Sequence, residues 1–450
     1  MPYEAEAGNI TIALVGDAMI NRRMAVHREP EYLELIDIVR SADFATVNLE
    51  TQINEYEHSW AQKRGSVSWQ VGEPGCLDDL RWMGFDAVTV ASNHSFDFNE
   101  AGFLTTLRHV RDRGLAAAGG GTNLDEARAP AILDLAPGRV ALMAACSTFS
   151  EQSVAGAARP DFPGKPGINA LHHDVVHLVP RHVFEALREA KRELGYEEYE
   201  EVQRRFHPVR SGRYDRETEV RILGRSFRLA DGYAIETSCR DAEIEAIERW
   251  IRGTGKHTDW RIYSVHSHES GPTGEIHEAC RESPPGFLID FAHRAVDSGC
   301  HVVTGHGPHF LRGIELYKGR PIFYSLGNFI FHNDTVRRQP EPAYSRQGLG
   351  DAHTPGDWGA ARSGEGAWGF PVDAAFYRSI IAVCEFAGGE LREVRLHPVD
   401  LGFGKRMSQR GRPLPASPEV ANEIVLWLQR LSKPYGTRID NEDGVGVIRP

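Results

Sequence analysis

Short apolar runs alternate with amphipathic stretches over most of this chain. Residues 10–16, 42–50 and 86–94 are rich in Ala, Val and Ile, and each run predicts a buried strand. Residues 101–114 place apolar side chains three and four positions apart and end in glycine, which predicts an amphipathic helix. This strand–helix alternation favours an α/β fold with a largely parallel central sheet.

The same alternation returns in the second half of the chain. Residues 258–270 predict a strand, residues 286–299 predict a helix, and the β-branched run before Thr304 predicts a further strand. A pair of turn glycines within residues 378–401 predicts a hairpin, and Ser417 caps a predicted last helix.

Two stretches depart from this pattern. A charged helical pattern over residues 180–206 and a small predicted hairpin indicate an insertion at about residues 175–235. The insertion is either a lid that contacts the substrate or a solvated helical decoration, and the sequence leaves both interpretations open. Residues 332–375 are rich in Gly, Pro and Arg, which predicts a long loop. We therefore interpret residues 1–450 as a single catalytic domain that carries an insertion and a long loop.

Composition and charge argue against several classes of partner. The chain has 450 residues, of which 41% are hydrophobic and 25% charged, as is typical of soluble globular proteins. Its formal net charge of -12 argues against nucleic-acid binding. No apolar run reaches the length of about 18 residues that a membrane span needs, and the acidic N-terminal stretch does not resemble a signal peptide. We predict a cytoplasmic protein that binds neither membranes nor nucleic acids.

The predicted strands share a chemical feature at their carboxyl ends. Five strands finish in side chains that bind metals, namely Asp17; Asn48 and Glu50; Asn93 and His94; His266 and His268; His306 and His309. Taken singly, each of these is more often a helix cap, a turn residue or a hydrogen-bonded structural histidine. Because parallel strands end at the same edge of a sheet, we expect these side chains to converge there. The sequence therefore predicts a metal site.

The types of donor narrow the choice of metal. Oxygen and imidazole ligands without cysteine favour Mn, Fe, Zn or Ni, and Ca stays open as well. A shared carboxylate with several histidines would hold one or two divalent ions, which lie about 3.5–4 Å apart in two-metal hydrolases. The six cysteines are scattered without a CxxC pair, so we interpret them as buried thiols.

Six motifs carry a family resemblance. In chain order they are GDAM (16–19), VNLE (47–50), ASNHSFD (91–97), VHSHE (265–269), GHGPH (305–309) and YSLGNFIF (324–331). Together they resemble the CapA family of poly-γ-glutamate capsule biosynthesis proteins, within the calcineurin-like metallophosphoesterase superfamily. The resemblance covers roughly residues 10–175 and 258–401. It implies a four-layer α/β/β/α fold with a dinuclear metal centre.

The resemblance also implies roles for individual residues. The implied metal ligands are Asp17, Glu50, Asn93, His266 and His306. His94 resembles the superfamily's histidine that approaches the substrate, and Asp97 would orient its ring. His268 and His309 are implied to be ligands or residues that support them, and Asn328 is interpreted as a turn residue near the metals.

The reaction stays open between three hypotheses. Soluble proteins of this kind include a peptide epimerase of lasso-peptide biosynthesis, which this chain resembles. In that case His94 and one of His268 or His309 would exchange a Cα proton. The second hypothesis is metal-dependent hydrolysis of a phosphoester or of an amide such as a γ-glutamyl bond. The third is a non-catalytic binding protein.

Two departures from the superfamily's pattern bear on this choice. Met19 stands where the superfamily has a histidine ligand, and Glu50 stands where it has a bridging aspartate. The lost histidine counts against a fast phosphatase. The expected partner is a peptide or small-molecule substrate, and the oligomeric state stays open.

Overall fold

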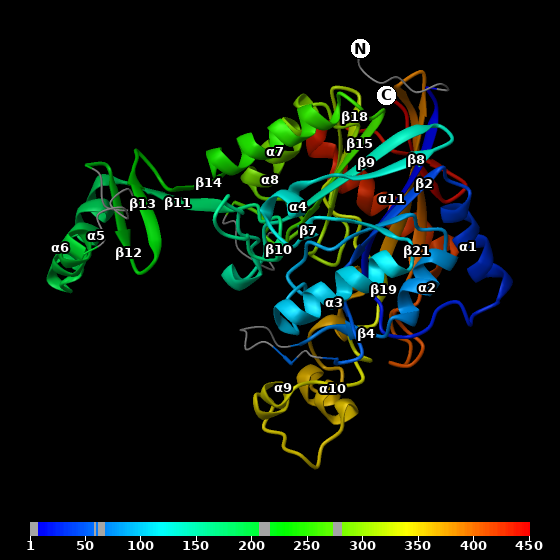
Figure 1. Ribbon diagram of the computed structural model, residues 1–450, viewed down its shortest axis with the longest axis horizontal. Coiled ribbons are helices and arrows are strands. Elements are labelled where there is room, and N and C mark those ends of the chain that lie inside the picture. The colour runs from blue at the N-terminus through cyan, green and yellow to red at the C-terminus, as the bar shows by residue number, and fades with distance from the viewer. Residues whose placement is uncertain (1–7, 58–59, 62–67, 207–216, 273–280) are drawn as a thin grey trace. The chain divides into compact units, whose positions relative to one another are not determined.

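The fold consists of two compact units. The computed structural model describes residues 8–57, 60–61, 68–206, 217–272 and 281–450 (Figure 1). The larger unit comprises Met1–Leu171, Ile244–His268 and Ala292–Pro450, and the smaller unit comprises His172–Glu243 and Glu269–Phe291. Among the described residues, no helix is long and apolar enough to cross a membrane.

The first sheet of the larger unit contains the first predicted strands. Its order is β23-β24-β21-β20-β1-β2-β5-β6, with β19 paired to β1 and β22 paired to β21. The strands are β1 (Ile10–Met19), β2 (Phe44–Leu49), β5 (Ala87–Thr89), β6 (Ala116–Ala118), β19 (Asn328–Phe331), β20 (Arg378–Ala387), β21 (Glu390–Asp400), β22 (Leu414–Pro415), β23 (Asp440–Glu442) and β24 (Val445–Ile448). Strands β19, β1, β2, β5 and β6 are parallel, and β20 and β21 form an antiparallel hairpin. The predicted parallel centre and the predicted hairpin are both confirmed.

The second sheet of the larger unit has the order β17-β18-β16-β15-β9-β8. Its strands are β8 (Ala131–Leu135), β9 (Gly138–Cys146), β15 (Trp260–His266), β16 (Val302–His306), β17 (Ile314–Tyr317) and β18 (Arg320–Phe323). The four inner strands are parallel, whereas β8 and β17 close the two edges as antiparallel strands.

Alternation along β1 shows how one strand serves two cores. Ile12 and Leu14 belong to a cluster with Leu142 of β9 and Ile262 of β15, so this core lies between the two sheets. Val15 belongs to a second cluster, which contains the apolar faces of three helices. These helices are α1 (Pro30–Arg40), α2 (Gly75–Trp82) and α3 (Asn99–Asp112). Because both faces of β1 are buried, its sequence is largely apolar rather than alternating.

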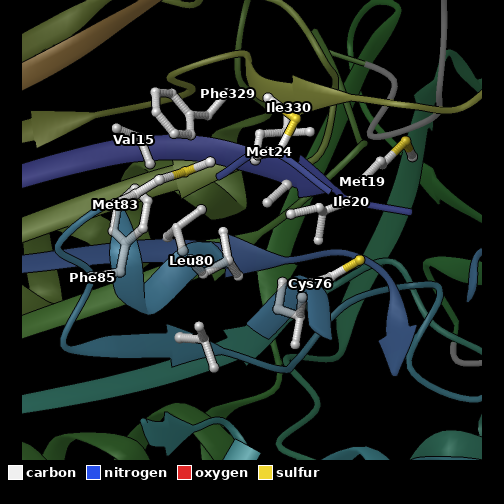
Figure 2. Close-up of a cluster of buried hydrophobic side chains, with 14 of the residues drawn as sticks. Val15, Met19, Ile20, Met24, Cys76, Leu80, Met83, Phe85, Phe329 and Ile330 are labelled. Carbon is white, nitrogen blue, oxygen red and sulfur yellow. The ribbon is translucent and has the colours of Figure 1, made fainter. Parts of the chain in front are cut away.

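Figure 2 shows part of this second core. Val15 of β1, Phe329 of β19 and Leu80 of α2 lie together there, and all three are buried. The helices thereby cover the outer face of the first sheet. The molecule thus has the mixed α/β architecture of the calcineurin-like fold that the sequence predicts.

Smaller elements complete the larger unit. Two short strand pairs are β3 (Gln52–Ile53) with β4 (Val71–Gly72) and β7 (Gly120–Gly121) with β10 (Gly167–Ile168). The other helices are α4 (Leu124–Arg128), α7 (Asp241–Thr254), α8 (Gly286–Asp297) and α11 (Pro418–Ser432), of which α7 and α8 extend into the smaller unit. An ion pair of 2.7 Å between Glu248 and Arg294 joins α7 to α8. Ser417 caps α11 by accepting the backbone N–H of Val420, as predicted.

The smaller unit contains most of the predicted insertion. It has a four-stranded sheet of order β12-β13-β11-β14. The strands are β11 (His173–Val179), β12 (Glu219–Ile222), β13 (Arg225–Leu229) and β14 (Ala234–Cys239). The predicted hairpin is the antiparallel pair of β12 and β13. The helical pattern of residues 180–206 is divided into α5 (Arg181–Glu193) and α6 (Tyr196–Phe206) at Gly195, which has a left-handed φ of 74°. That this region is an insertion on a single catalytic domain stays a prediction.

The long loop predicted over residues 332–375 contains short helices, α9 (Glu341–Ser345) and α10 (Pro355–Ser363). Thr354 and Asp357 form a capping box at the start of α10, and Pro355 occupies its first turn. Trp358 of this helix packs in a small cluster with Trp69 and Val336. The segment has few aliphatic residues, so its helices lack the apolar periodicity that reveals longer ones.

Candidate metal centre

The site begins where β1 lies between β2 and β19. Asp17 of β1 is in register with Asn48 of β2 on one side and with Asn328 of β19 on the other. Gly16 allows the close approach of β19, because a Cβ atom there would lie 1.8 Å from the carbonyl oxygen of Gly327. Asn48 donates a hydrogen bond of 2.8 Å from Nδ2 to Oδ1 of Asp17, which fixes the carboxylate.

The second sheet supplies two histidines at the ends of neighbouring strands. His266 of β15 and His306 of β16 are in register. The chain then turns at Gly307, which has a left-handed φ of 115° and whose N–H donates to Oδ2 of Asp17 over 3.0 Å. The Gly-His-Gly-Pro-His motif thereby links the ends of the two sheets. Ser264 lies two residues before His266, and its Oγ is 2.6 Å from Nε2 of His306.

Asp17, His266 and His306 form the first set of donors. Oδ1 of Asp17 lies 3.7 Å from Nδ1 of His266 and 3.6 Å from Nδ1 of His306. The two histidine Nδ1 atoms are 3.1 Å apart. All three side chains are buried.

Glu50, His266 and His268 form the second set. Oε1 of Glu50 lies 3.7 Å from Nε2 of His266 and 3.9 Å from Nε2 of His268. Asn93 contributes its Oδ1 at 3.2 Å from the same His266 nitrogen. His268 donates its backbone N–H to Oγ1 of Thr148 over 2.9 Å. The ring of His266 therefore lies between the two sets, with one nitrogen facing each.

The protonation states fit a metal. Burial lowers the pKa of His306 to about 4 and lowers the pKa values of His266 and His268 well below the ordinary value, so these rings are neutral at neutral pH. Burial alone would raise the pKa of Asp17, but the hydrogen bond from His309 and the neighbouring imidazoles outweigh it and hold this pKa well below its usual value. Neutral imidazole and ionised carboxylate are the forms that ligate metals. The donor atoms of each set lie within 4.8 Å of one another, which fits one or two divalent ions.

His309 is positioned differently from the other histidines. Nδ2 of Asn328 donates to the carbonyl oxygens of His309 and Phe376, each over 3.0 Å, which fixes the orientation of the amide. Nδ1 of His309 lies 3.0 Å from Oδ1 of Asn328, 3.4 Å from Oδ2 of Asp17 and 3.6 Å from Oε2 of Glu50. All three oxygens are acceptors, so the ring carries a proton on Nδ1. This leaves the lone pair of His309 on Nε2. The interaction also holds His309 in a left-handed backbone conformation, with φ of 68°. Asn328 is thus a buried strand residue that orients His309, and its interpretation as a turn residue is wrong.

His94 has the same tautomer for a different reason. Its Nδ1 lies 2.6 Å from Oδ2 of Asp97, which also accepts the backbone N–H of Gln70 over 2.6 Å. An ionised carboxylate can only accept, so Nδ1 carries a proton, and the lone pair of the neutral ring lies on Nε2. Nε2 of His94 lies 3.9 Å from Oε1 of Glu50.

Apolar rings border the site. Phe331 and Phe370 lie with their ring centroids 5.8 and 5.9 Å from the ring of His309. Phe370 belongs to the segment predicted as a long loop. The structure brings together the ten strand-end and supporting side chains that the sequence singles out: Asp17, Asn48, Glu50, Asn93, His94, Asp97, His266, His268, His306 and His309. The supporting residues Ser264 and Thr148 are not apparent from the sequence, although Ser264 shares a strand face with His266.

The fold and the donor sets define a protein of the calcineurin-like metallophosphoesterase class. Two sheets of largely parallel strands bring Asp, Glu, Asn and His side chains to their carboxyl ends, and these form a buried cluster suited to divalent metals. Comparison with known sequences then assigns the family. The sequence model of the bacterial capsule synthesis protein family PGA_cap matches residues 11–333, and the chain belongs to this family. The predicted resemblance to CapA is thereby confirmed.

Individual relatives differ in how much they share with this chain. An uncharacterized protein, y4sH, of Sinorhizobium fredii (strain NBRC 101917 / NGR234) is 34% identical over 98% of this chain and 93% of its own length. The PGA biosynthesis protein CapA of Bacillus subtilis (strain 168) is 22% identical over 73% of this chain and 65% of its own length. The capsule biosynthesis protein CapA of Bacillus anthracis is 20% identical over 74% of this chain and 62% of its own length.

Proposed function

We propose that this protein is a metal-dependent enzyme that acts on a peptide, and that its reaction is the epimerisation of a Cα atom. The observation that carries this proposal is the pair of imidazoles with fixed tautomers beside the donor sets. His94 and His309 each have a proton held on Nδ1 by a buried acceptor and a lone pair on Nε2. Removal of a Cα proton and delivery of a proton to the opposite face need two such imidazoles, one neutral and the other protonated on Nε2 as well.

In this proposal the remaining histidines hold the metal. The proposed ligands are Asp17, Glu50, Asn93, His266 and His306, with His268 completing the second set. A divalent ion bound there would act as a Lewis acid on a carbonyl or carboxylate oxygen of the peptide. His309 is proposed as a base rather than a ligand, because Asn328 holds the proton on its Nδ1.

The two imidazoles have different hydrogen-bond partners on Nδ1, a carboxylate for His94 and an amide for His309. The carboxylate of Asp97, 2.6 Å from Nδ1 of His94, stabilises a protonated His94. We therefore propose that His309 accepts the Cα proton on Nε2 and that His94 delivers a proton from its Nε2 to the other face. After one turnover His94 is neutral and His309 is protonated on Nε2, and exchange of these protons with water restores the starting state.

Metal-dependent hydrolysis is the second candidate. The Bacillus relatives carry names that refer to capsule and PGA biosynthesis, which supports a substrate with amide bonds, such as a γ-glutamyl peptide. The same donors would then hold an ion that activates water. Met19 is a buried apolar residue where the superfamily has a histidine ligand. This substitution counts against phosphoester hydrolysis and leaves hydrolysis of an amide open.

The experiment separates the two reactions. We would measure the metal content of the purified protein, incubate it in deuterated water with lasso-precursor and γ-glutamyl peptides, and follow the products by mass spectrometry. One deuterium at a Cα atom without loss of mass supports epimerisation. Cleavage of an amide or release of phosphate without exchange rejects it in favour of hydrolysis.

Matched variants test the two bases. His94→Gln and His309→Gln should each slow deuterium exchange by about 100-fold or more and keep their metal, because each removes a base and spares the proposed ligands. The exposed His353 supplies the control, and His353→Gln should behave as the unsubstituted protein. Exchange at an unchanged rate in both base variants would contradict the assignment.

A further inference from the structure

A cavity lies beyond the ends of the strands that carry Asp17 and Asn328. Beyond β1 and β19, the backbone N–H of His332 donates to the carbonyl oxygen of Met19 over 3.0 Å. A cavity of about 490 Å³ opens there. Its charged and titratable lining comes from three separate segments of the chain, and consists of Arg22, Arg23, His27, His332, Lys405 and Arg412. None of these residues belongs to the metal centre.

The cavity is strongly basic in a protein whose formal net charge is -12. Four of its lining side chains are cationic and none is acidic. Neighbouring carboxylates pair with two of the four: Asp79 lies 2.6 Å from Arg23, and Glu29 lies 2.9 Å from Arg412. Among the described residues, Arg22 and Lys405 form no ion pair with a carboxylate. The lining therefore retains two positive charges that these ion pairs leave uncompensated.

Arg22 is held in place by backbone carbonyl oxygens rather than by an ion pair. Its Nη1 and Nη2 atoms donate to the backbone carbonyl oxygens of Ser408 and Arg410 over 2.9 and 3.0 Å. Burial lowers the pKa of Arg22, an effect that Asp334 opposes and the nearby charge of Arg412 reinforces. A guanidinium in this position is poorly solvated, so an anion in the cavity would gain a strong and pre-oriented partner.

His332 adds an uncharged donor to the lining. Burial, with the charge of Arg22 next in size, lowers the pKa of His332 well below its ordinary value, so the ring is neutral. The backbone N–H of Asn21 faces Nδ1 of His332 at 3.4 Å, which assigns the ring proton to Nε2. A neutral imidazole with its proton on Nε2 donates a hydrogen bond and cannot repel a cationic neighbour.

We propose that this cavity is a binding site for an anion that carries at least two negative charges on phosphate or carboxylate oxygens. Arg22 and Lys405, the two lining cations that form no ion pair with a carboxylate of the described residues, determine the charge that the ligand must carry. Because they come from different segments of the chain, the ligand must reach both. The site is separate from the metal centre and does not depend on the reaction proposed there. Phosphate esters and acidic peptides share this chemistry, and the test distinguishes them.

The test is calorimetric titration of the full-length protein. The metal is first removed with a chelator, which is then dialysed away, so that an anion cannot bind through the metal. Inorganic pyrophosphate represents the phosphate class and the dipeptide Glu-Glu represents the carboxylate class. We expect one equivalent of at least one probe to bind at low ionic strength, and the affinity to fall as salt is added.

Lys405 is suited to substitution because its side chain is exposed. Lys405→Ala should weaken binding by about tenfold, and Lys405→Glu by more, since a charged hydrogen-bond partner is lost and then reversed. Lys256, which is also exposed and does not line this cavity, supplies the control, and Lys256→Ala should leave the affinity unchanged.

Each outcome of the titration either supports the anion site or rejects it. Binding of pyrophosphate alone assigns the site to phosphate-bearing ligands, and binding of the dipeptide alone assigns it to acidic peptides. The proposal is overturned if neither probe binds the metal-free protein, or if Lys405→Glu binds as tightly as the unsubstituted chain. Binding that needs the metal would place the anion at the metal centre and also reject this site.

Discussion

His266 is the residue on which both donor sets depend. Its Nδ1 faces Asp17 and His306, and its Nε2 faces Glu50 and His268. His266→Ala should therefore lower metal affinity by more than about 100-fold. Loss of a residue that only hydrogen-bonds to a ligand already lowers metal affinity by about 10- to 100-fold. His268→Ala should weaken only the second set and retain metal at the first.

Elemental analysis after dialysis and calorimetric titration would measure both effects. His353→Ala, at an exposed position, is the control and should bind metal normally. Full metal content in His266→Ala would show that the cluster is a structural hydrogen-bond network.

The buried histidines also predict how stability depends on pH. The pKa of His306 is about 4 in the folded state, whereas a histidine of the unfolded chain has a pKa near 6.5. In the metal-free protein this contribution to stability is therefore complete above about pH 6.5 and is lost as the pH falls towards about 4. For His306 alone the loss is about 3 kcal/mol. His266 and His268 have pKa values shifted in the same direction and add to it.

Urea unfolding across this pH window would measure the effect. The comparison is with His306→Asn, which removes the titrating group and should lose about 3 kcal/mol less between the two ends of the window. Equal pH dependence in both proteins would mean that His306 is protonated in the folded state.

At the scale of secondary-structure elements, the contact of β1 with β19 governs the site. Gly16→Ala would place a Cβ atom 1.8 Å from the carbonyl oxygen of Gly327, and backbone atoms cannot move aside as a flexible side chain can. We expect a loss of at least about 3 kcal/mol in the free energy of unfolding, together with weaker metal binding. Gly253→Ala in α7 meets no atom within 4 Å and should stabilise by about 0.5–1 kcal/mol. Urea unfolding of the two variants, followed by tryptophan fluorescence, tests the contrast, and two similar midpoints would contradict it.

The strands and helices that could be predicted from the sequence are those with a regular pattern of apolar residues. The apolar run of residues 10–16 predicts β1, because both faces of this strand are buried, but β1 continues through Asp17 to Met19. Convergence of the strand ends is a rule of parallel sheets, so the nine strand-end residues could be named before their distances were known, whereas Asp97 was named from the family resemblance. Asn328 could not be assigned, because its role depends on a left-handed His309 that lies far from it in sequence. Phe370 and α10 were missed because Gly-rich and Pro-rich sequence carries no periodic signal.

At the scale of the whole molecule, the two units differ in what they contain. Every residue of the candidate site belongs to the larger unit, from Asp17 to His309. The smaller unit has its own sheet and its own apolar cluster, which includes Val179, Phe184 and Val220. This division supports the proposal that residues of about 175–235 serve substrate recognition or are a decoration, and that they do not hold the metal.

Removal of the insertion tests that division. In the antiparallel pair of β11 and β14, Asp174 lies opposite Ser238, so an Asn-Gly turn between these two residues could replace residues 175–237. We expect the shortened protein to fold and to bind as much metal as the full chain, because the donor sets are intact. If the insertion contacts the substrate, exchange of the Cα proton should fall by about tenfold or more through a higher KM, whereas a decoration would leave it unchanged. Elemental analysis and the deuterium assay measure the two quantities separately, and loss of metal on deletion would show that the smaller unit supports the centre.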